Sequence, residues 1–285
     1  MPQTINTNLV SLNAQRNLSA SQSQLSTSMQ RLSSGLRVNS AKDDAAGLAI
    51  AERMSSQVRG MNVAIRNAND GISLAQTAEG ALGKVGDMLQ RMRELAVQAA
   101  NGTNTSEDRI SLNNEYVQLA NESTRTLSGA RFNGIEVLGS SASTFQIGAG
   151  TVASLDQISV AAFAWTGAGA ITTAVGSAPG VDPAAGITGD DGSAAVTAIT
   201  NLDAAINAVN AGRATFGAVQ NRFDNVVSNL MVSSENQSAA RSRIMDADYA
   251  SETANLSRAS ILQQAGNAMV AQANQLPQQV LALLR

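Results

Sequence analysis

The side chains that could carry chemistry in this chain are few in kind. The sequence has no Cys and no His, so it offers no thiol nucleophile, disulfide, zinc–thiolate site or imidazole general base. Carboxylate or Ser–Lys chemistry stays open, but most hydrolytic and metal-dependent mechanisms lack their usual residues. We therefore expect that the protein is not an enzyme and that it uses no cofactor or metal.

A Gly-x-Gly sequence at Gly148 and Gly150 is the nearest approach to a nucleotide-binding motif. The rest of the dinucleotide fingerprint and the helix that should follow it are missing. The net charge of −3 and the lack of a basic run give no surface for nucleic acid. No apolar run approaches the roughly 20 residues of a membrane span. The N-terminus also lacks the regions of a secretory signal peptide, so we expect no membrane partner and no Sec-type export.

A long apolar stripe identifies the element around which the chain is organised. Its members recur in steps of three and four at Met54, Val58, Met61, Ile65, Ala68, Ile72, Ala75, Ala78, Leu82, Val85, Leu89, Met92, Ala96 and Ala99. As one helix the stripe would be about 70 Å long. A helix of that length needs other long helices beside it, and the pattern predicts an antiparallel bundle or coiled coil.

Two further helices are expected to complete this rod. The turn at residues 101–104 is followed by a capping box, with Thr105 as N-cap and Asp108 reaching back. The helix then continues to about Ser128, with Ile110, Val117, Ala120 and Leu127 on its buried face. Helical periodicity resumes at Val196 and continues through Ile199, Leu202, Ile206, Val209, Phe216, Phe223, Val227 and Leu230. These segments predict a three-helix bundle.

The middle of the chain differs from the rest in composition. Glycines concentrate between residues 129 and 192, together with Pro179, Pro183 and Trp165. Residues 145–147 and 158–160 alternate apolar with polar side chains, which predicts a β-hairpin. We expect residues 164–192 to form an exposed loop, because they are small, flexible and mildly acidic.

The two ends resemble each other in composition. Both are rich in Ser, Asn, Gln and Ala, carry few charges and have leucines at helical spacing. One interpretation is a marginal helix on a globular core. The interpretation that we favour is a pair of segments that are disordered alone and fold on meeting partners. The side chains expected to mediate polymerisation are Leu9, Leu25, Leu32, Leu36, Leu262, Met269, Leu276, Val280, Leu283 and Leu284.

This layout predicts self-association. Pairing the two ends would still leave apolar surface exposed, and a head-to-tail contact that does not close into a ring produces a helical filament. The expected fold class is mainly α, a long antiparallel bundle or coiled coil with paired N- and C-terminal helices and a small β-hairpin and loop insertion.

Specific motifs of the chain resemble bacterial flagellin. Among them are Leu32-Ser33-Ser34-Gly35-Leu36-Arg37 and Gln90-Arg91-Met92-Arg93-Glu94-Leu95-Ala96-Val97-Gln98. Further matching segments are residues 5–8, 43–50, 132–134, 217–223, 240–244, 248–250, 261–265 and 272–285. They lie in order over about residues 1–140 and 195–285. The middle departs from the family pattern, because it has no room for the outer β domains of larger flagellins.

The resemblance implies a domain organisation and a function. Residues 1–44 and 246–285 would pair as an inner tube domain, residues 45–140 and 195–245 would form the helical rod, and residues 141–194 would be the hairpin and variable loop. The chain would be secreted and would polymerise with itself into the extracellular flagellar filament for motility.

The partners implied by the resemblance are the flagellar type III export apparatus, an export chaperone, the filament cap and the hook–filament junction proteins. The resemblance also implies binding by Toll-like receptor 5 of hosts, through Arg91, Leu95 and Glu115. Arg91 and Leu95 are four residues apart, and we expect both to lie off the core stripe and to be exposed on the isolated rod. In the filament the same residues would pack between subunits.

Three alternatives remain at this level. A hook–filament junction protein shares flagellin-like ends, although residues 90–98 favour the filament subunit. A soluble helical binding module would be a monomer with stable ends. An enzyme would need an inserted catalytic module, for which the middle is too short.

Overall fold

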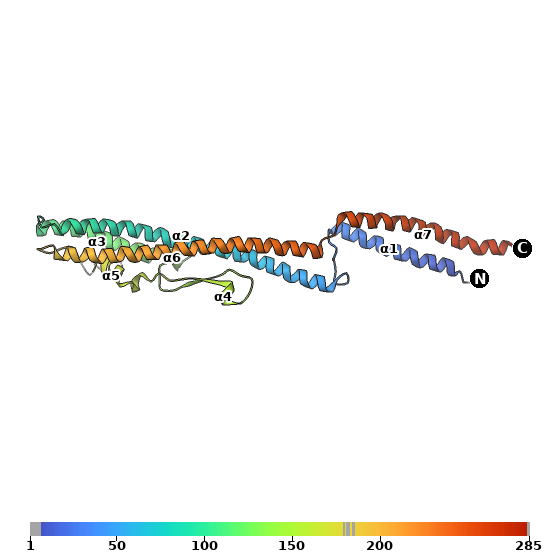
Figure 1. Cartoon of the computed structure of the whole chain (residues 1–285), viewed down its shortest axis with the longest axis horizontal. Helices are drawn as coiled ribbons and strands as arrows, with labels where there is room; N and C mark the ends of the chain where they lie inside the picture. Colours follow the sequence, from blue (N-terminus) through green and yellow to red (C-terminus); the bar gives the residue numbers. More distant parts are fainter. Residues whose placement is uncertain (1–6, 179, 181–182, 184–185, 284–285) are drawn as a thin grey trace. The chain divides into compact units, whose positions relative to one another are not determined.

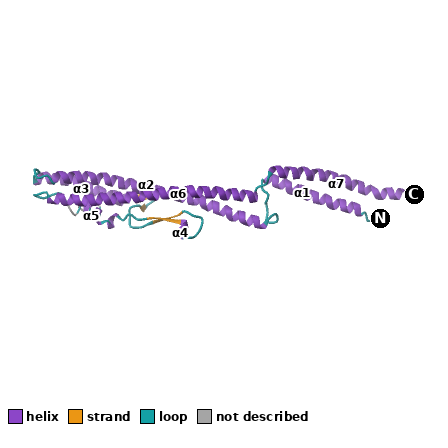
Figure 2. Cartoon of the chain, viewed as in Figure 1, coloured by secondary structure: helices purple, strands orange, loops and turns teal. Residues whose placement is uncertain are grey.

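The computed structural model describes residues 7–178, 180, 183 and 186–283, with side chains described as far as residue 275. The chain divides into two compact units. One comprises residues 1–58 and 235–285, and the other comprises residues 59–234. Helices α2 (Ala45–Ala99) and α6 (Ser193–Met245) contribute residues to both units. Helices dominate the described part, with the strands confined to the middle of the sequence (Figure 2).

In the first unit, helix α1 (Leu9–Ser34) lies antiparallel to helix α7 (Tyr249–Leu283) (Figure 1). The Asn8 side chain caps the start of α1 by accepting a hydrogen bond from the Ser11 backbone N–H at 3.1 Å. Gly35 ends the helix with a φ of 71°, a left-handed conformation that suits glycine. Gly35 is thus the C-cap of α1.

The same unit contains two connectors, residues 35–44 between α1 and α2 and residues 246–248 between α6 and α7. They are bonded to each other. Leu36 and Asp246 form an antiparallel bridge, and the Ala247 backbone N–H donates to the Gly35 carbonyl at 2.9 Å. Beside them is a small core of buried side chains with partly buried neighbours, made of Val38, Ala51, Met245, Leu36, Leu48 and Ile244.

The second unit is built on the long helix that the apolar stripe predicted. The stripe residues from Ala75 to Ala99 are buried in one core with residues of α6 and of α3 (Ser106–Gly129). The predicted capping box is confirmed, since the Asp108 backbone N–H donates to the Thr105 hydroxyl and the Asp108 carboxylate accepts from the Thr105 backbone N–H. The antiparallel helical rod is therefore as expected.

The buried face of α3 differs from the expected one. Ile110 is 52% exposed, whereas Arg109 and Tyr116 are fully buried. The buried positions of α3 are Arg109, Tyr116, Ala120, Ser123, Thr124 and Leu127. The face is therefore rotated by one residue at its N-terminal end, where Arg109 and Tyr116 are buried in place of the expected Ile110 and Val117.

Two antiparallel hairpins follow α3. Strands β1 (Arg131–Phe132) and β2 (Ile135–Glu136) form a minimal one around Asn133 and Gly134, both of which have positive φ. Strands β3 (Ser143–Gln146) and β4 (Gln157–Val160) form the predicted hairpin, with Phe145 opposite Ile158. The Phe145 ring meets the Phe223 ring of α6 edge to face, with 5.6 Å between centroids.

Residues 164–192 are not the exposed loop that their composition suggested. This segment, here called the strap, contains a 3-10 turn, η1 (Trp165–Gly167), and helix α5 (Gly169–Val175). Trp165, Ile171, Val175 and Ile187 belong to the core of the second unit and are at most 6% exposed. The expectation was wrong because a few apolar side chains suffice to bury a glycine-rich segment. Pro179 and Asp182, part of that expectation, lie outside the described residues.

Within the described ranges, no helix is both long enough and apolar enough to cross a membrane.

Candidate functional site

The contact surface between α1 and α7, here called the seam, is the first candidate. Its positions on both helices recur in steps of three and four, which is the spacing of a coiled-coil interface. They are Ser11, Ala14, Leu18, Ser21, Leu25, Ser28 and Leu32 on α1, and Glu252, Leu256, Ala259, Gln263, Gly266, Val270 and Ala273 on α7. Small and polar residues make up most of the seam, so two helices can approach closely while burying little apolar area.

Polar bonds join the two helices near both ends of the seam. The Asn8 amide donates to the Ala273 carbonyl at 2.7 Å, and the Ser11 hydroxyl donates to the Asn274 side-chain oxygen at 2.8 Å. At the other end, the Tyr249 hydroxyl donates to the Leu32 carbonyl at 3.0 Å. These bonds fix the antiparallel direction of the pair.

Large apolar side chains lie on the outside of the pair, where this chain does not cover them. They are Leu9, Val10, Leu12, Met29, Ile261, Leu262 and Met269, each at least 46% exposed. The terminal pair thus exposes apolar surface on both helices, and such surface typically marks an interaction site.

The predicted polymerisation residues fall into three groups. Leu9, Leu262 and Met269 are exposed, the last at 60%. Leu25 and Leu32 are half-buried in the seam, and Leu36 is half-buried in the connector that follows α1. Leu284 lies outside the described residues, as do the side chains of Leu276, Val280 and Leu283.

The Arg91 surface is the second candidate. The Arg91 guanidinium donates to the Glu94 carboxylate at 2.9 Å and, from α2 to α3, to the Glu115 carboxylate at 3.0 Å. Both hydrogen bonds, that to Glu94 first, raise the pKa of Arg91 above its ordinary value. All three side chains are about half exposed or more, so this charged cluster is available at the surface of the unit.

Leu95 does not share that exposure. The side chain was expected to project from the same accessible face as Arg91, but it is 1% exposed and belongs to the core. The reason is that α2 packs against more than one neighbour, so its buried arc is wider than the stripe of Leu89, Met92 and Ala96 alone. The prediction that Arg91 and Leu95 are both exposed on the rod is therefore wrong for Leu95.

Arg109 is a further positioning residue that sequence reasoning missed. Its buried guanidinium donates to the carbonyls of Ala99 at 2.9 Å, Gly189 at 3.0 Å, Asp190 at 2.7 Å and Asn101 at 3.3 Å. It thereby ties the end of α2 to the strap. The available signal was its position seven residues before Tyr116, in phase with the buried face of α3.

The Gly-x-Gly sequence takes part in an internal loop. The Asp156 carboxylate lies against Gly148 and Gly150 and accepts a hydrogen bond from the Val152 backbone N–H at 2.9 Å. Glycines are needed here because a Cβ at either position would collide with that carboxylate. The two glycines therefore make room for the Asp156 carboxylate within this loop.

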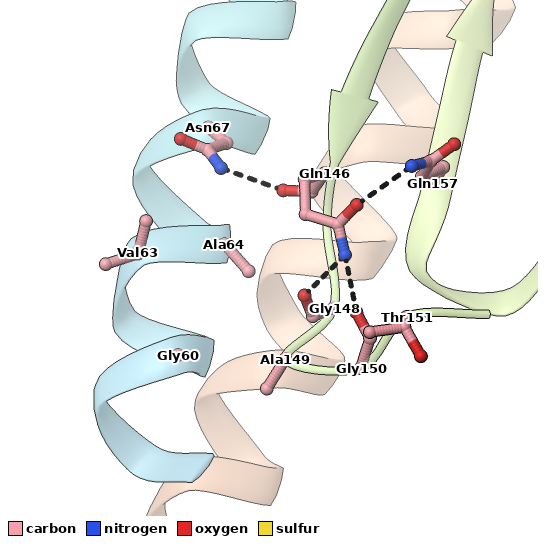
Figure 3. Close-up of a pocket in the computed structure, with 10 residues that line it drawn as sticks. All are labelled: Gly60, Val63, Ala64, Asn67, Gln146, Gly148, Ala149, Gly150, Thr151 and Gln157. Carbon is pink, nitrogen blue, oxygen red and sulfur yellow. Dashed lines mark hydrogen bonds between the residues drawn. The ribbon is translucent and has the colours of Figure 1, made fainter. Parts of the chain in front are cut away.

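A groove of about 600 Å³ lies between this loop and α2 (Figure 3). Asn67 donates to the Gln146 carbonyl at 2.9 Å, and the Gln146 amide donates to the carbonyls of Gly148 and Gly150. None of the residues lining it is charged. In the part of the chain that the structure covers, there is also no cluster of three acidic side chains suited to a metal ion.

Comparison with known families decides the identity. Residues 5–143 match the bacterial flagellin N-terminal helical region, and residues 199–284 match the C-terminal helical region. The chain belongs to the bacterial flagellins. The family is structural, which agrees with the expectation of a protein that is not an enzyme.

Individual relatives extend over the whole chain. A flagellin of Halalkalibacterium halodurans is 47% identical over 285 residues, with 99% of both chains covered. The flagellar filament 33 kDa core protein of Treponema phagedenis is 42% identical and the flagellin of Bacillus subtilis 41%, again with 99% of both chains covered. The crystal structure of Bacillus cereus flagellin matches 58% of this chain and 88% of that chain, at 34% identity and a TM-score of 0.47.

Proposed function

We propose that the chain is a structural subunit that polymerises into the bacterial flagellar filament through the outer apolar surface of α1 and α7. The observation that carries this proposal is the division of roles on the terminal helices. Their seam is made largely of small and polar residues, while large side chains such as Leu9, Ile261 and Met269 stay exposed. Burying the exposed part of these side chains against neighbouring subunits would supply about 1–2 kcal/mol each.

The domain roles follow the same proposal. We assign residues 1–44 and 246–285 to the inner tube of the filament, residues 45–140 and 195–245 to the rod, and residues 141–194 to the hairpin and strap. The paired helices α1 and α7 support the first assignment, and the shared core of α2, α3 and α6 supports the second.

Export and assembly partners belong to this function. We propose secretion through the flagellar type III apparatus with an export chaperone, and assembly between the filament cap and the hook–filament junction proteins. The absence of Cys is compatible with passage of an unfolded chain, since no disulfide would have to be reduced.

Host recognition is proposed at the Arg91 surface. The exposed ion cluster of Arg91 and Glu115 offers charge-assisted hydrogen bonds to Toll-like receptor 5. Leu95 supports this surface from beneath, because it is buried in the rod core.

Seeded polymerisation tests the filament proposal. We expect purified chain to elongate filament fragments and to sediment with them. The double variant Leu262→Gln with Met269→Gln should stay in the supernatant while keeping the helical circular dichroism of its rod. Deletion of residues 276–285 should have the same effect.

A matched control is Leu155→Gln, which changes a leucine that is 76% exposed in helix α4 (Ala153–Asp156) of the second unit. This variant should polymerise normally. Normal filaments from the Leu262 and Met269 double variant would contradict the proposal, and a parent chain that stays monomeric with seeds would favour a soluble binding module.

A further inference from the structure

The turn of the β1–β2 hairpin consists of Asn133 and Gly134, which have positive φ angles of 49° and 81°. Positive φ at both central residues is the mark of a type I′ turn. Both residues are exposed. Neither the peptide group that joins them nor the Asn133 side chain makes a hydrogen bond with a described residue. This peptide group and this side chain are therefore free to rotate while the flanking pair of Phe132 and Ile135 stays in place.

An asparagine followed by a glycine carries two groups that can react with each other. The glycine backbone nitrogen can attack the side-chain carbonyl carbon of the asparagine and close a succinimide ring, and glycine hinders that attack least because it has no Cβ. The ring is planar, so the attacking nitrogen must eclipse Cβ about the Cα–C bond. For an L residue this means a ψ of about −120°, which is also the value at the first central residue of a type II′ turn.

The hairpin allows Asn133 to reach this geometry without losing its strand pairing. Types I′ and II′ both fit a two-residue hairpin, and they differ by a flip of the central peptide. The flip keeps φ of Asn133 positive and takes its ψ from about 30° to about −120°. Gly134 can follow, because glycine adopts negative φ as readily as positive φ. One peptide flip thus brings the Gly134 nitrogen to the side of the Asn133 side chain, an arrangement close to that needed for attack.

The other Asn-Gly sequence of the chain, Asn101-Gly102, is restrained. The Asn101 carbonyl accepts hydrogen bonds from the Asn104 backbone N–H at 3.2 Å and from the buried Arg109 guanidinium at 3.3 Å. The Asn101 side-chain oxygen accepts from the Thr103 backbone N–H at 3.4 Å. Rotating the peptide between Asn101 and Gly102 to close a ring would break both bonds to the carbonyl. The same dipeptide is therefore held back at one place in the fold and free at the other.

We propose that Asn133 is a modification site, at which the folded chain deamidates through a succinimide. A bond forms between the Gly134 nitrogen and the Asn133 Cγ atom, while the bond from Cγ to Nδ2 breaks. The Gly134 nitrogen gives up its proton to solvent, and the Nδ2 group takes up a proton and leaves as ammonia. Water then adds to either carbonyl carbon of the ring and opens it. The products are therefore aspartate and isoaspartate, with water as the only co-reactant.

The isoaspartate product would disturb the hairpin. Its main chain passes through the former side chain, which adds a methylene carbon to a turn of two residues, and its free carboxylate adds a negative charge. The adjoining residues hold the hairpin on the second unit, since Phe132 packs against the core and Val137 and Leu138 are buried in it. Deamidation at Asn133 would thus loosen the attachment of residues 131–138.

Peptide mapping of the full-length chain during storage in mildly alkaline buffer tests the proposal. Trypsin separates the two sites, since Asn101 lies in fragment 94–109 and Asn133 in fragment 132–213. Mass spectrometry then measures the deamidated fraction of each fragment. In the folded chain Asn133 should deamidate at least about tenfold faster than Asn101, because two hydrogen bonds of Asn101 must break before its ring can close. Equal rates, or a faster reaction at Asn101, would overturn the proposal.

Unfolding the chain in urea provides the first control. The two sites should then react at similar rates, because neither turn persists. A tenfold difference that remained in urea would show that the neighbouring sequence, and not the turn, sets the rate. The products give a second check, since isoaspartate must accompany aspartate if the succinimide forms. Aspartate alone would overturn the proposed route.

A matched variant exchanges the two turn residues, Asn133→Gly with Gly134→Asn. It keeps the composition of the turn, but its asparagine is followed by Ile135, a β-branched residue that crowds the attacking nitrogen. Fragment 132–213 of this variant should lose the modification while the helical circular dichroism of the chain is retained. Deamidation of that fragment at an unchanged rate would place the reaction elsewhere and would refute the assignment to Asn133.

Discussion

Gly266 of α7 lies so close to Leu18 of α1 that a methyl group on residue 266 would stand 3.1 Å from the Leu18 Cδ1 atom and 3.8 Å from its Cα atom. An alanine at residue 266 would therefore crowd the end of the Leu18 side chain by a few tenths of an ångström, which the glycine avoids. The same small residue makes α7 intrinsically weaker as a helix, by about 1 kcal/mol relative to alanine.

The first prediction compares two glycine substitutions in polymerised chains. Gly80→Ala, at a position with open space around it, should raise the melting temperature, because it gains about 0.5–1 kcal/mol of helix propensity. Gly266→Ala should show no such gain, because crowding of Leu18 offsets it. Circular dichroism during heating measures both. Equal stabilisation by the two substitutions would show that the seam is not tightly packed.

The second prediction separates Leu95 from Arg91. Leu95→Ala should lower the free energy of unfolding by about 2–5 kcal/mol, because it leaves a cavity in the rod core. Arg91→Ala should leave stability nearly unchanged, because its ion pairs are exposed.

Urea unfolding followed by circular dichroism provides the stability measurement, and activation of receptor-bearing reporter cells provides the second readout. Arg91→Ala should weaken activation although the chain remains folded. Loss of activation only in variants that also unfold would contradict a receptor contact at Arg91.

The third prediction concerns the hydrogen bonds by which Arg109 joins the end of α2 to the strap. Arg109→Ala removes the donor for four carbonyl oxygens and should cost more than about 2 kcal/mol of stability. Arg109→Lys should recover only part of the loss, because an ammonium group cannot span the same acceptors.

Trp165 offers a local readout of this change, since it is the single tryptophan and is buried with the strap. Its emission should shift to longer wavelength in Arg109→Ala before the long helices unfold. The exposed Arg125→Ala serves as the control and should leave the emission unchanged. Coincident loss of tryptophan burial and of helicity would show that the strap has no separate stability.

The fourth prediction is a pH dependence. Burial raises the pKa of Tyr116 to about 12, because the charged phenolate would lose its hydration. The folded chain thus holds the phenol proton more tightly than the unfolded chain. This contribution to stability is fully present below pH 10.0 and is lost as the pH rises through about 12.

Absorbance titration of Tyr249→Phe isolates the Tyr116 phenol, because the chain has two tyrosines. The midpoint should lie near pH 12 in the folded chain and near 10.0 in urea. A single midpoint near 10.0 under both conditions would mean that Tyr116 is accessible to water.

Periodicity predicted the long helices well, because apolar residues spaced as Leu82, Val85 and Leu89 share one face only if the segment is an α-helix. It failed where side chains do not follow the usual division of polar outside and apolar inside. Arg109 is buried because its guanidinium donates to four backbone carbonyls. The residues next to Arg109 in the sequence do not predict that these carbonyls lie around it.

The strap was also predicted wrongly, as exposed although it is largely buried. Its glycines predicted exposure, but its docking depends on α3 side chains far away in sequence. The Asn113 side-chain oxygen accepts from the Ile187 backbone N–H at 3.0 Å, and the Tyr116 hydroxyl donates to the Ala174 carbonyl at 3.4 Å. Leu95 was misplaced for a similar reason, since its neighbours in the core come from elements that local spacing does not reveal.

The paired connectors of the first unit have a mechanical consequence. A single connector between two helices could straighten under load without breaking any contact. Here the bridge of Leu36 with Asp246 and the hydrogen bond from Ala247 to Gly35 link the two connectors, and the Arg37 side chain donates to the Ile244 carbonyl at 2.8 Å. Lengthening one connector therefore breaks its bonds to the other. Tension or torque between the helices that the connectors join is consequently shared by both connectors.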